Sequence, residues 1–318
     1  MEKPLLGIST CLLGKDVRYD GGHKLDKYLR DFLGQFVDYV PVCPEVECGM
    51  SIPREALRLV GDPSSPRLIT RKSGKDYTEQ MTTWAKGRLA ELQELPLCGY
   101  VFKSKSPSSG MERVRVYPKE GSGVQPSRKG VGMWARAFMD HFPLLPVEEE
   151  GRLNDALLRE NFIERVFVVY RWRSFTEGKQ SIGGLVDFHT RHKLLLLAHS
   201  QKHYRQLGKL VARGKEMSIE ELYGEYFEVL MQALKLKTTV RKQVNVLNHV
   251  LGYFKKQLSS DEKQEAVELI EKYKEGQVPL IVPITLLNHY VRKYEQEYLQ
   301  QQWYLKPHPG ELKLRNHC

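Results

Sequence analysis

The first 150 residues alternate short apolar runs with amphipathic segments. Three apolar runs have the length of strands, namely Leu5–Ser9, Val37–Val42 and Leu97–Phe102. Two segments repeat their apolar positions every three or four residues, as helices do, namely Lys24–Phe36 and Thr78–Leu95. This alternation predicts an α/β domain with a Rossmann-like open sheet. Because the loops beyond the carboxyl ends of such strands meet in one crevice, we expect the strand-end loops to form the site.

The pattern changes in the second half of the chain. From Ile163 onward the apolar spacing of three and four residues continues through long segments, and it predicts an all-α helical domain. The clearest predicted helices are Leu185–Leu207, Ile219–Leu234, Thr239–Leu258, Ser260–Tyr273 and Ile281–Tyr294. Ser260, followed by two acidic residues, is the expected N-cap of its helix. The acidic run at 148–150 and the glycine after it favour domains at 1–152 and 153–318.

Composition narrows the class of protein. No apolar stretch approaches the roughly 18–20 residues that a membrane helix needs, and the start lacks a signal-peptide pattern, so we expect a cytoplasmic protein without membrane contact. Five cysteines, an odd number, do not suggest a disulfide framework. Residues 1–150 hold 22 basic and 20 acidic residues, and 151–318 hold 27 and 19. The basic second half suits a polyanionic partner; nothing indicates a protein partner.

Three cysteines follow predicted strands. Cys11 lies just past the first, and Cys43 and Cys48 lie in the loop after the second. Thiolates are soft ligands that suit an iron-sulfur cluster, zinc or copper(I), and three of them leave a coordination position open. Buried packing is the alternative, since free cysteine is often a small apolar filler. Cys98 lies inside an apolar run and is expected in the core.

The same loops carry acid–base and anion-binding groups. Glu45 lies two residues from Cys43, where it can move protons beside a metal, and Glu47 is a weaker candidate. Residues 103–110 (KSKSPSSG) supply hydroxyls and two lysines, which suit a polar or anionic ligand or else a flexible turn. Arg18 and Tyr19 add a cation and a ring able to stack on a base.

Together these loops resemble the thiouracil desulfidase (TudS-like) family. The resemblance covers about residues 4–150 and rests on ordered motifs: STCLLG at 9–14, RYDG at 18–21, PVCPE at 41–45, PR at 53–54 and KSKSPSSG at 103–110. Residues 187–200 and 245–254 resemble a YbgA-type helical domain, which is also found fused behind a desulfidase domain. The fused form is similar to enzymes that return 4-thiouridine in tRNA to uridine.

The resemblance implies a 4Fe-4S cluster held by three cysteines, with one iron open to the substrate sulfur. It implies catalysis by Glu45 and by a serine that maps to Ser106. Ser109 stands where many relatives have a cysteine, so Cys48 is assigned as the third ligand beside Cys11 and Cys43; an altered site is the alternative. The residues expected to bind substrate are Arg18, Tyr19, Lys103, Lys105, Ser108 and Ser109.

The helical domain is the expected tRNA-binding part. Its candidate phosphate contacts form two basic groups: Lys202, Arg205, Lys209 and Arg213, then Lys235, Lys237, Arg241 and Lys242. Four histidines at 189, 192, 199 and 203 are expected to pack or to contact phosphates rather than hold a second metal. The predicted function is desulfurisation of 4-thiouridine in tRNA. Alternatives are a desulfidase of free thiouracil and a non-enzymatic RNA-binding or redox-sensing iron-sulfur protein.

Overall fold

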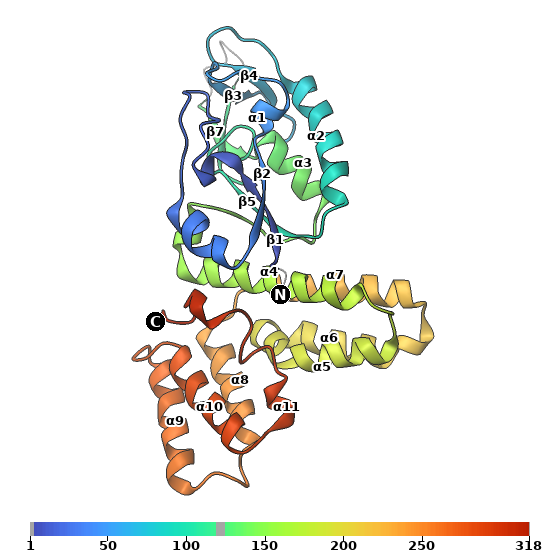
Figure 1. The fold of residues 1–318 in the computed structure, drawn as a ribbon, viewed down its shortest axis with the longest axis vertical. Helices are drawn as coiled ribbons and strands as arrows, with labels where there is room; N and C mark the ends of the chain where they lie inside the picture. Colours follow the sequence, from blue (N-terminus) through green and yellow to red (C-terminus); the bar gives the residue numbers. More distant parts are fainter. Residues whose placement is uncertain (1–2, 119–124, 318) are drawn as a thin grey trace. The chain divides into compact units, whose positions relative to one another are not determined.

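The computed structural model describes residues 3–118 and 125–317. The chain divides into two compact units, Met1–Asp155 and Ala156–Cys318, where the sequence placed the division after residue 152. The first unit is α/β and the second is helical (Figure 1), so the predicted fold class is confirmed.

A parallel four-stranded sheet forms the centre of the first unit. Its strands, in spatial order, are β2 (Asp38–Val42), β1 (Leu5–Ser9), β5 (Leu97–Phe102) and β8 (Val147–Glu149). The first three match the predicted runs. Because β1 pairs in parallel with both β2 and β5, the carboxyl ends of these three strands, and the loops that follow them, lie at one edge.

Helices α2 (Thr78–Gln93) and α3 (Met133–His141) lie side by side in the first unit (Figure 1). Trp134 of α3 donates its indole N–H to the Tyr100 hydroxyl of β5 at 3.1 Å, and Tyr100 also contacts Phe138 with ring centroids 4.7 Å apart. A side chain at Gly7 of β1 would place its Cβ 2.2 Å from the Tyr100 ring. Glycine in β1 therefore makes room for this aromatic core.

The segment predicted as a helix at Lys24–Phe36 is irregular. It contains a π-helical turn, η2 (Tyr28–Phe32), followed by a 3₁₀ turn, η3 (Leu33–Gln35). Only Leu29 and Leu33 are buried in these turns, too few apolar positions to impose a regular helix.

A second four-stranded sheet was not foreseen. Its spatial order is β4 (Arg67–Thr70), β3 (Leu57–Val60), β6 (Val114–Tyr117) and β7 (Ser127–Gly130), with antiparallel outer pairs and a parallel central pair. Each strand has four residues. Three of the strands mix apolar with charged side chains and β7 has no apolar side chain, so they give little signal in the sequence.

The second unit is helical throughout its regular segments. Its α-helices are α4 (Ala156–Thr176), α5 (Ile182–His199), α6 (Gln201–Ala212), α7 (Ile219–Lys235), α8 (Val240–Gly252), α9 (Ser260–Lys274), α10 (Ile281–Lys293) and α11 (Glu297–Gln300). Across the described residues, no helix has both the length and the apolar character needed to cross a membrane.

Several predicted helix boundaries were wrong. The helix predicted over Thr239–Leu258 ends at Gly252. The helix predicted over Leu185–Leu207 is divided at Ser200, whose hydroxyl accepts the backbone N–H of His203 at 3.3 Å and so caps α6. The N-cap of α9 is Ser259 rather than Ser260. Its hydroxyl accepts the N–H of Glu262 at 3.2 Å, and the Glu262 carboxylate accepts the N–H of Ser259 at 2.9 Å. This reciprocal pair fixes the start of α9.

Candidate functional site

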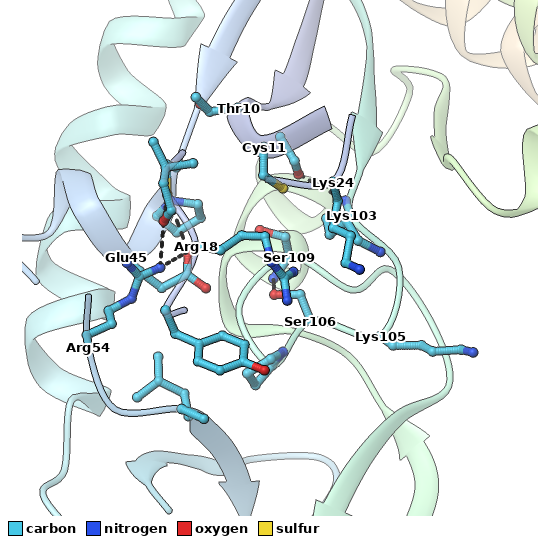
Figure 2. Close-up of a pocket in the computed structure, with 18 of the residues that line it drawn as sticks. Thr10, Cys11, Arg18, Lys24, Glu45, Arg54, Lys103, Lys105, Ser106 and Ser109 are labelled. Atoms are coloured by element: carbon cyan, nitrogen blue, oxygen red, sulfur yellow. Dashed lines mark hydrogen bonds and ion pairs between the residues drawn. The ribbon is translucent and has the colours of Figure 1, made fainter. Parts of the chain in front are cut away.

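Two thiols from neighbouring strands line one cavity. Cys11 lies in η1 (Thr10–Leu13), directly after β1, and Cys43 lies directly after β2 at the start of α1 (Pro44–Glu47). The cavity has a volume of about 360 Å³, and Figure 2 shows Cys11, Glu45, Ser106 and Ser109 along its walls. The parallel register of β1 and β2 brings the two cysteines together, as the strand-end argument predicts.

Cys48 is placed differently. It packs in the apolar cluster of the second sheet, beside Met50, Leu59 and Met81, and its sulfur contacts the Glu45 carbonyl oxygen at 3.4 Å. It does not line the cavity. In residues 3–118 and 125–317, no three His, Cys, Asp or Glu side chains converge as a metal site. A cluster held by all three thiols therefore requires the Cys48 side chain to turn out of this core.

The donor set nevertheless fits an iron-sulfur centre chemically. Burial and, to a smaller extent, the Glu45 carboxylate together raise the pKa of Cys11 to about 11, of Cys43 to about 12 and of Cys48 to about 11. The charge of the Glu45 carboxylate thus opposes the ionisation of all three thiols. Groups that resist ionisation in this way become thiolates when a metal supplies the compensating positive charge.

A chain of hydrogen bonds connects Glu45 with two serines of the third loop. The Ser108 hydroxyl donates to Glu45 Oε1 at 2.5 Å, and Ser106 Oγ lies 2.9 Å from Ser108 Oγ. Glu45 Oε2 lies 3.6 Å from Cys43 Sγ. Ser108 is fully buried, whereas Ser106 lines the cavity. The arrangement can pass a proton between the cavity surface and the Glu45 carboxylate.

The third loop is held rigidly by the start of α3. The backbone N–H of Ala135 donates to the carbonyl of Ser108 at 3.1 Å, and the N–H of Gly132 donates to that of Gly110 at 2.7 Å. A Cβ at Gly132 would lie 2.5 Å from the Ser108 carbonyl oxygen. Only glycine allows this close approach, which fixes the position of Ser108 beside Glu45.

Two acidic residues hold the ends of the same loop, and sequence reasoning treated them as part of a domain boundary. Glu150 accepts the backbone N–H and the hydroxyl of Ser104, both at 2.7 Å, and forms an ion pair with Lys103 at 2.5 Å. Glu149, which is buried, accepts the N–H of Met111 at 2.7 Å. In the sequence, the feature that could have identified them as part of the site is their position directly after an apolar turn, at the end of β8.

The predicted substrate-binding residues mostly reach the cavity. Its lining includes Arg18, Tyr19, Lys103, Lys105 and Ser109, whereas Ser108 lies behind it. Glu47, the weaker acid–base candidate, instead accepts the backbone N–H of Cys43 at 2.8 Å. This hydrogen bond stabilises the start of α1. Three further cations in the lining were not among the predicted site residues: Lys24, Arg54 and Arg71.

Most of the basic residues predicted in the helical unit are exposed, and three of them share one helix. Lys202, Arg205 and Lys209 are exposed on α6 at helical spacing, and Arg213 caps that helix and pairs with Glu216 at 2.8 Å. Lys235, Lys237 and Arg241 are exposed. Lys242 instead donates to the carbonyl oxygen of His199 at 2.6 Å, so its ammonium group has a structural partner.

Three of the four histidines named in the sequence analysis are buried, whereas His203 is half-buried beside the Ser200 hydroxyl. His192 is buried, stacks on Phe188 with ring centroids 4.0 Å apart and has Nδ1 2.7 Å from the Phe188 carbonyl oxygen. His199 is buried against Glu164 at 2.5 Å, and His189 lies 3.1 Å from the Tyr226 hydroxyl. These partners account for the three buried rings without a metal.

Thiols, a proton-accepting carboxylate and a buried serine relay at the carboxyl ends of parallel strands define an α/β enzyme site. Residues 6–150 match the family described as 2-thiouracil desulfurase, and residues 193–309 match a protein family of unknown function, DUF1722. The chain belongs to the 2-thiouracil desulfurase family, fused to a YbgA-like domain, and is therefore an enzyme that cleaves a carbon–sulfur bond.

Individual relatives and a solved structure each match half of the chain or less. Protein YbgA of Escherichia coli (strain K12) is 34% identical over 153 residues, which span 48% of this chain and 90% of that protein. Protein YbbK of Bacillus subtilis (strain 168) is 32% identical over 108 residues, or 32% of this chain and 71% of that one. A solved structure described as the 4Fe-4S-dependent thiouracil desulfidase TudS is 30% identical, covers 49% of this chain and 95% of its own, and has a TM-score of 0.38.

Proposed function

We propose that this enzyme converts 4-thiouridine in tRNA to uridine, using a 4Fe-4S cluster. The observation that carries the chemistry is the chain from Ser106 through Ser108 to Glu45, beside the thiols of Cys11 and Cys43. It places proton-transfer groups at a site with soft metal ligands, which is the combination that removal of sulfur requires.

The proposed reaction is a hydrolysis. Water adds to the thiocarbonyl carbon, a carbon–oxygen bond forms, the carbon–sulfur bond breaks, and sulfur leaves as sulfide with protons from the water. No electrons are gained or lost overall. A cluster held by Cys11, Cys43 and Cys48 supplies, when bound, a Lewis acid with affinity for sulfur.

The residues of the chain handle the protons. Glu45 accepts a proton from the attacking water, and Ser108 keeps its carboxylate oriented by donating at 2.5 Å. Ser106 faces the cavity and extends this path to the substrate. Arg54 lies 3.8 Å from the other Glu45 oxygen, so a cation faces this carboxylate. A thiolated base must leave its stack to enter a cavity of about 360 Å³.

The tRNA substrate is supported by the helical unit. Lys202, Arg205 and Lys209 present three cations on one face of α6, the spacing that suits successive contacts with a phosphate backbone. Tyr253 is 45% exposed and stacks on Tyr298 with ring centroids 5.1 Å apart, which offers a surface for an unpaired base.

The test compares substrates for the full chain after anaerobic insertion of iron and sulfide. Activity on thiolated tRNA is expected to exceed activity on free thiouracil at low salt and to fall steeply as salt rises, because phosphate contacts release counterions. Free thiouracil gives no such salt dependence. Equal activity on both substrates at every salt concentration would replace tRNA by the free base as the substrate.

A further inference from the structure

Helix α2 contacts the short helix α1, which lies between two of the proposed cluster ligands (Figure 1). Gln80, Trp84 and Arg88 follow one another at intervals of four residues, so they share one face of α2. All three side chains lie outside the lining of the cavity. Any part that they have in the reaction is therefore exerted through the segment 43–48, and not by contact with the substrate.

The Gln80 side chain holds the Cys48 end of this segment. Its amide nitrogen Nε2 donates to the Cys48 carbonyl oxygen at 2.5 Å. The next residue, Gly49, has a φ of 95°, and a Cβ at this position would lie 3.5 Å from Gln80 Nε2. Trp84, one turn further along α2, packs against the apolar cluster that contains Cys48. The backbone of Cys48 and the cluster around its side chain are thus both held by one face of α2.

Arg88 acts on the Cys43 end of the segment through Glu47. Glu47 Oε1 accepts the backbone N–H of Cys43 at 2.8 Å, and Arg88 Nε lies 3.3 Å from Glu47 Oε2. Arg88 also pairs with Glu91, one turn further along α2, at 2.6 Å. The two oxygens of the Glu47 carboxylate therefore connect the backbone of a proposed cluster ligand with α2.

The segment between these two ends carries Glu45 and has little stability of its own. Helix α1 has only four residues, and a helix of this length does not form without contacts from the rest of the protein. Its backbone N–H groups are nevertheless bonded in order: that of Cys48 donates to the Pro44 carbonyl, and that of Met50 to the Glu45 carbonyl, both at 3.0 Å. Because the turn is continuous, contacts that fix its two ends also fix the position of Glu45.

We propose that Gln80 and Arg88 are positioning residues for the reaction. Together they hold both ends of the segment that carries Cys43, Glu45 and Cys48, so two cluster ligands and the proton-accepting carboxylate keep one relative geometry. Groups that bind the ligands of a metal orient those ligands, and their loss typically lowers metal affinity or activity about 10- to 100-fold. This inference rests on the proposed function, in which Glu45 moves protons beside a cluster.

The test removes each contact from the full chain and keeps the size of the side chain. Gln80→Glu has the same shape but turns a carboxylate, in place of a donor, toward the Cys48 carbonyl. Arg88→Met keeps the length of the side chain and removes its charge. The matched controls lie on the same helix. They are Gln93→Glu, at an exposed position near the end of α2, and Lys86→Met, which is about 200° around the helix from Arg88.

Each protein is loaded with iron and sulfide without oxygen. The measurements are the rate at which a chelator removes the iron, the electron paramagnetic resonance (EPR) spectrum of the reduced cluster, the urea midpoint, and the turnover of 4-thiouridine per bound cluster. Iron loss from Gln80→Glu and from Arg88→Met is expected to be roughly tenfold faster than from wild type and controls. Their EPR spectra should differ from the wild-type spectrum, and their turnover should fall because Glu45 is displaced. Their urea midpoints should match those of the controls.

Glu47 provides a second comparison, which decides the question even where one of the first two variants fails to fold. Glu47→Gln keeps an oxygen that can accept the Cys43 N–H, whereas Glu47→Ala removes it. Iron loss is expected to be roughly tenfold faster from Glu47→Ala than from Glu47→Gln. Equal rates from these two variants overturn the positioning role, as do control variants of α2 that lose iron as fast as Gln80→Glu and Arg88→Met.

The proposed function and the positioning role fail in different ways. Wild-type protein that desulfurises thiolated tRNA, with unchanged iron loss and EPR spectra in every variant, rejects the positioning role and leaves the function standing. Wild-type protein that holds its cluster but desulfurises neither thiolated tRNA nor thiouracil rejects the function. In that case faster iron loss from Gln80→Glu and Arg88→Met still assigns both residues to the support of the cluster ligands.

Discussion

Removing the Ser108 hydroxyl tests the proton relay most sharply. Ser108→Ala deletes the donor that lies 2.5 Å from Glu45 Oε1 and interrupts the path to Ser106. A hydrogen bond to a charged group contributes about 1.5–3 kcal/mol, so the turnover number is expected to fall roughly 10- to 150-fold. The fold should survive, because the loop is held by backbone bonds to α3 that the substitution keeps.

The assay follows the loss of the near-ultraviolet absorption of 4-thiouridine under saturating substrate. The matched control is Ser64→Ala, which removes another serine hydroxyl bonded to a carboxylate, that of Asp62 at 2.7 Å, on an exposed turn. Iron content should stay at the wild-type value in both variants. A Ser108→Ala enzyme with wild-type turnover and full iron content would refute the relay.

Three further predictions concern the cluster, the loop and the helical unit. Cys48→Ala should lower the iron bound per chain, while Cys98→Ala in β5 should leave it unchanged; the opposite pattern would remove Cys48 from the ligand set. Gly132→Ala should lower the free energy of unfolding by about 1–3 kcal/mol, because its Cβ would meet the Ser108 carbonyl oxygen, and an unchanged urea midpoint would contradict that packing. Burial opposes ionisation of Glu164, yet His199 and Arg315 lower its pKa to about 2. The resulting stability, roughly 3 kcal/mol, is present above pH 4.5 and lost as pH falls toward 2. Urea unfolding at pH 5 and pH 3 measures it, and Glu164→Gln with an equally steep acid loss would contradict it.

The strands that carry the site were predictable because most of their residues are apolar. β1 and β5 match the predicted runs at both ends, and β2 begins one residue later than predicted. Parallel strands bring their following loops together, so Cys11, Cys43 and the third loop could be assigned to one site from the order of the strands in the sequence. The spacing of apolar residues along the sequence was thus enough to predict the strands on which the site is built.

The second sheet and its effect on Cys48 could not be foreseen. Its strands are too short to show a clear alternation, and the apolar cluster that they form with Met81 of α2 is built from distant segments. Cys48 packs into that cluster, so its burial depends on contacts with residues that are distant in the sequence. The roles of Glu149 and Glu150 could not be foreseen for the same reason, because their hydrogen-bond partners lie about 40 residues away in the sequence.

The central claim is that the reconstituted enzyme exchanges sulfur for oxygen in tRNA. Full-length protein, loaded with iron and sulfide without oxygen, is incubated with tRNA containing 4-thiouridine, and the nucleosides and the sulfide are quantified. The account predicts one uridine and one sulfide for each 4-thiouridine consumed, and no consumption with Glu45→Gln. Intact 4-thiouridine in the presence of a fully loaded cluster would contradict it.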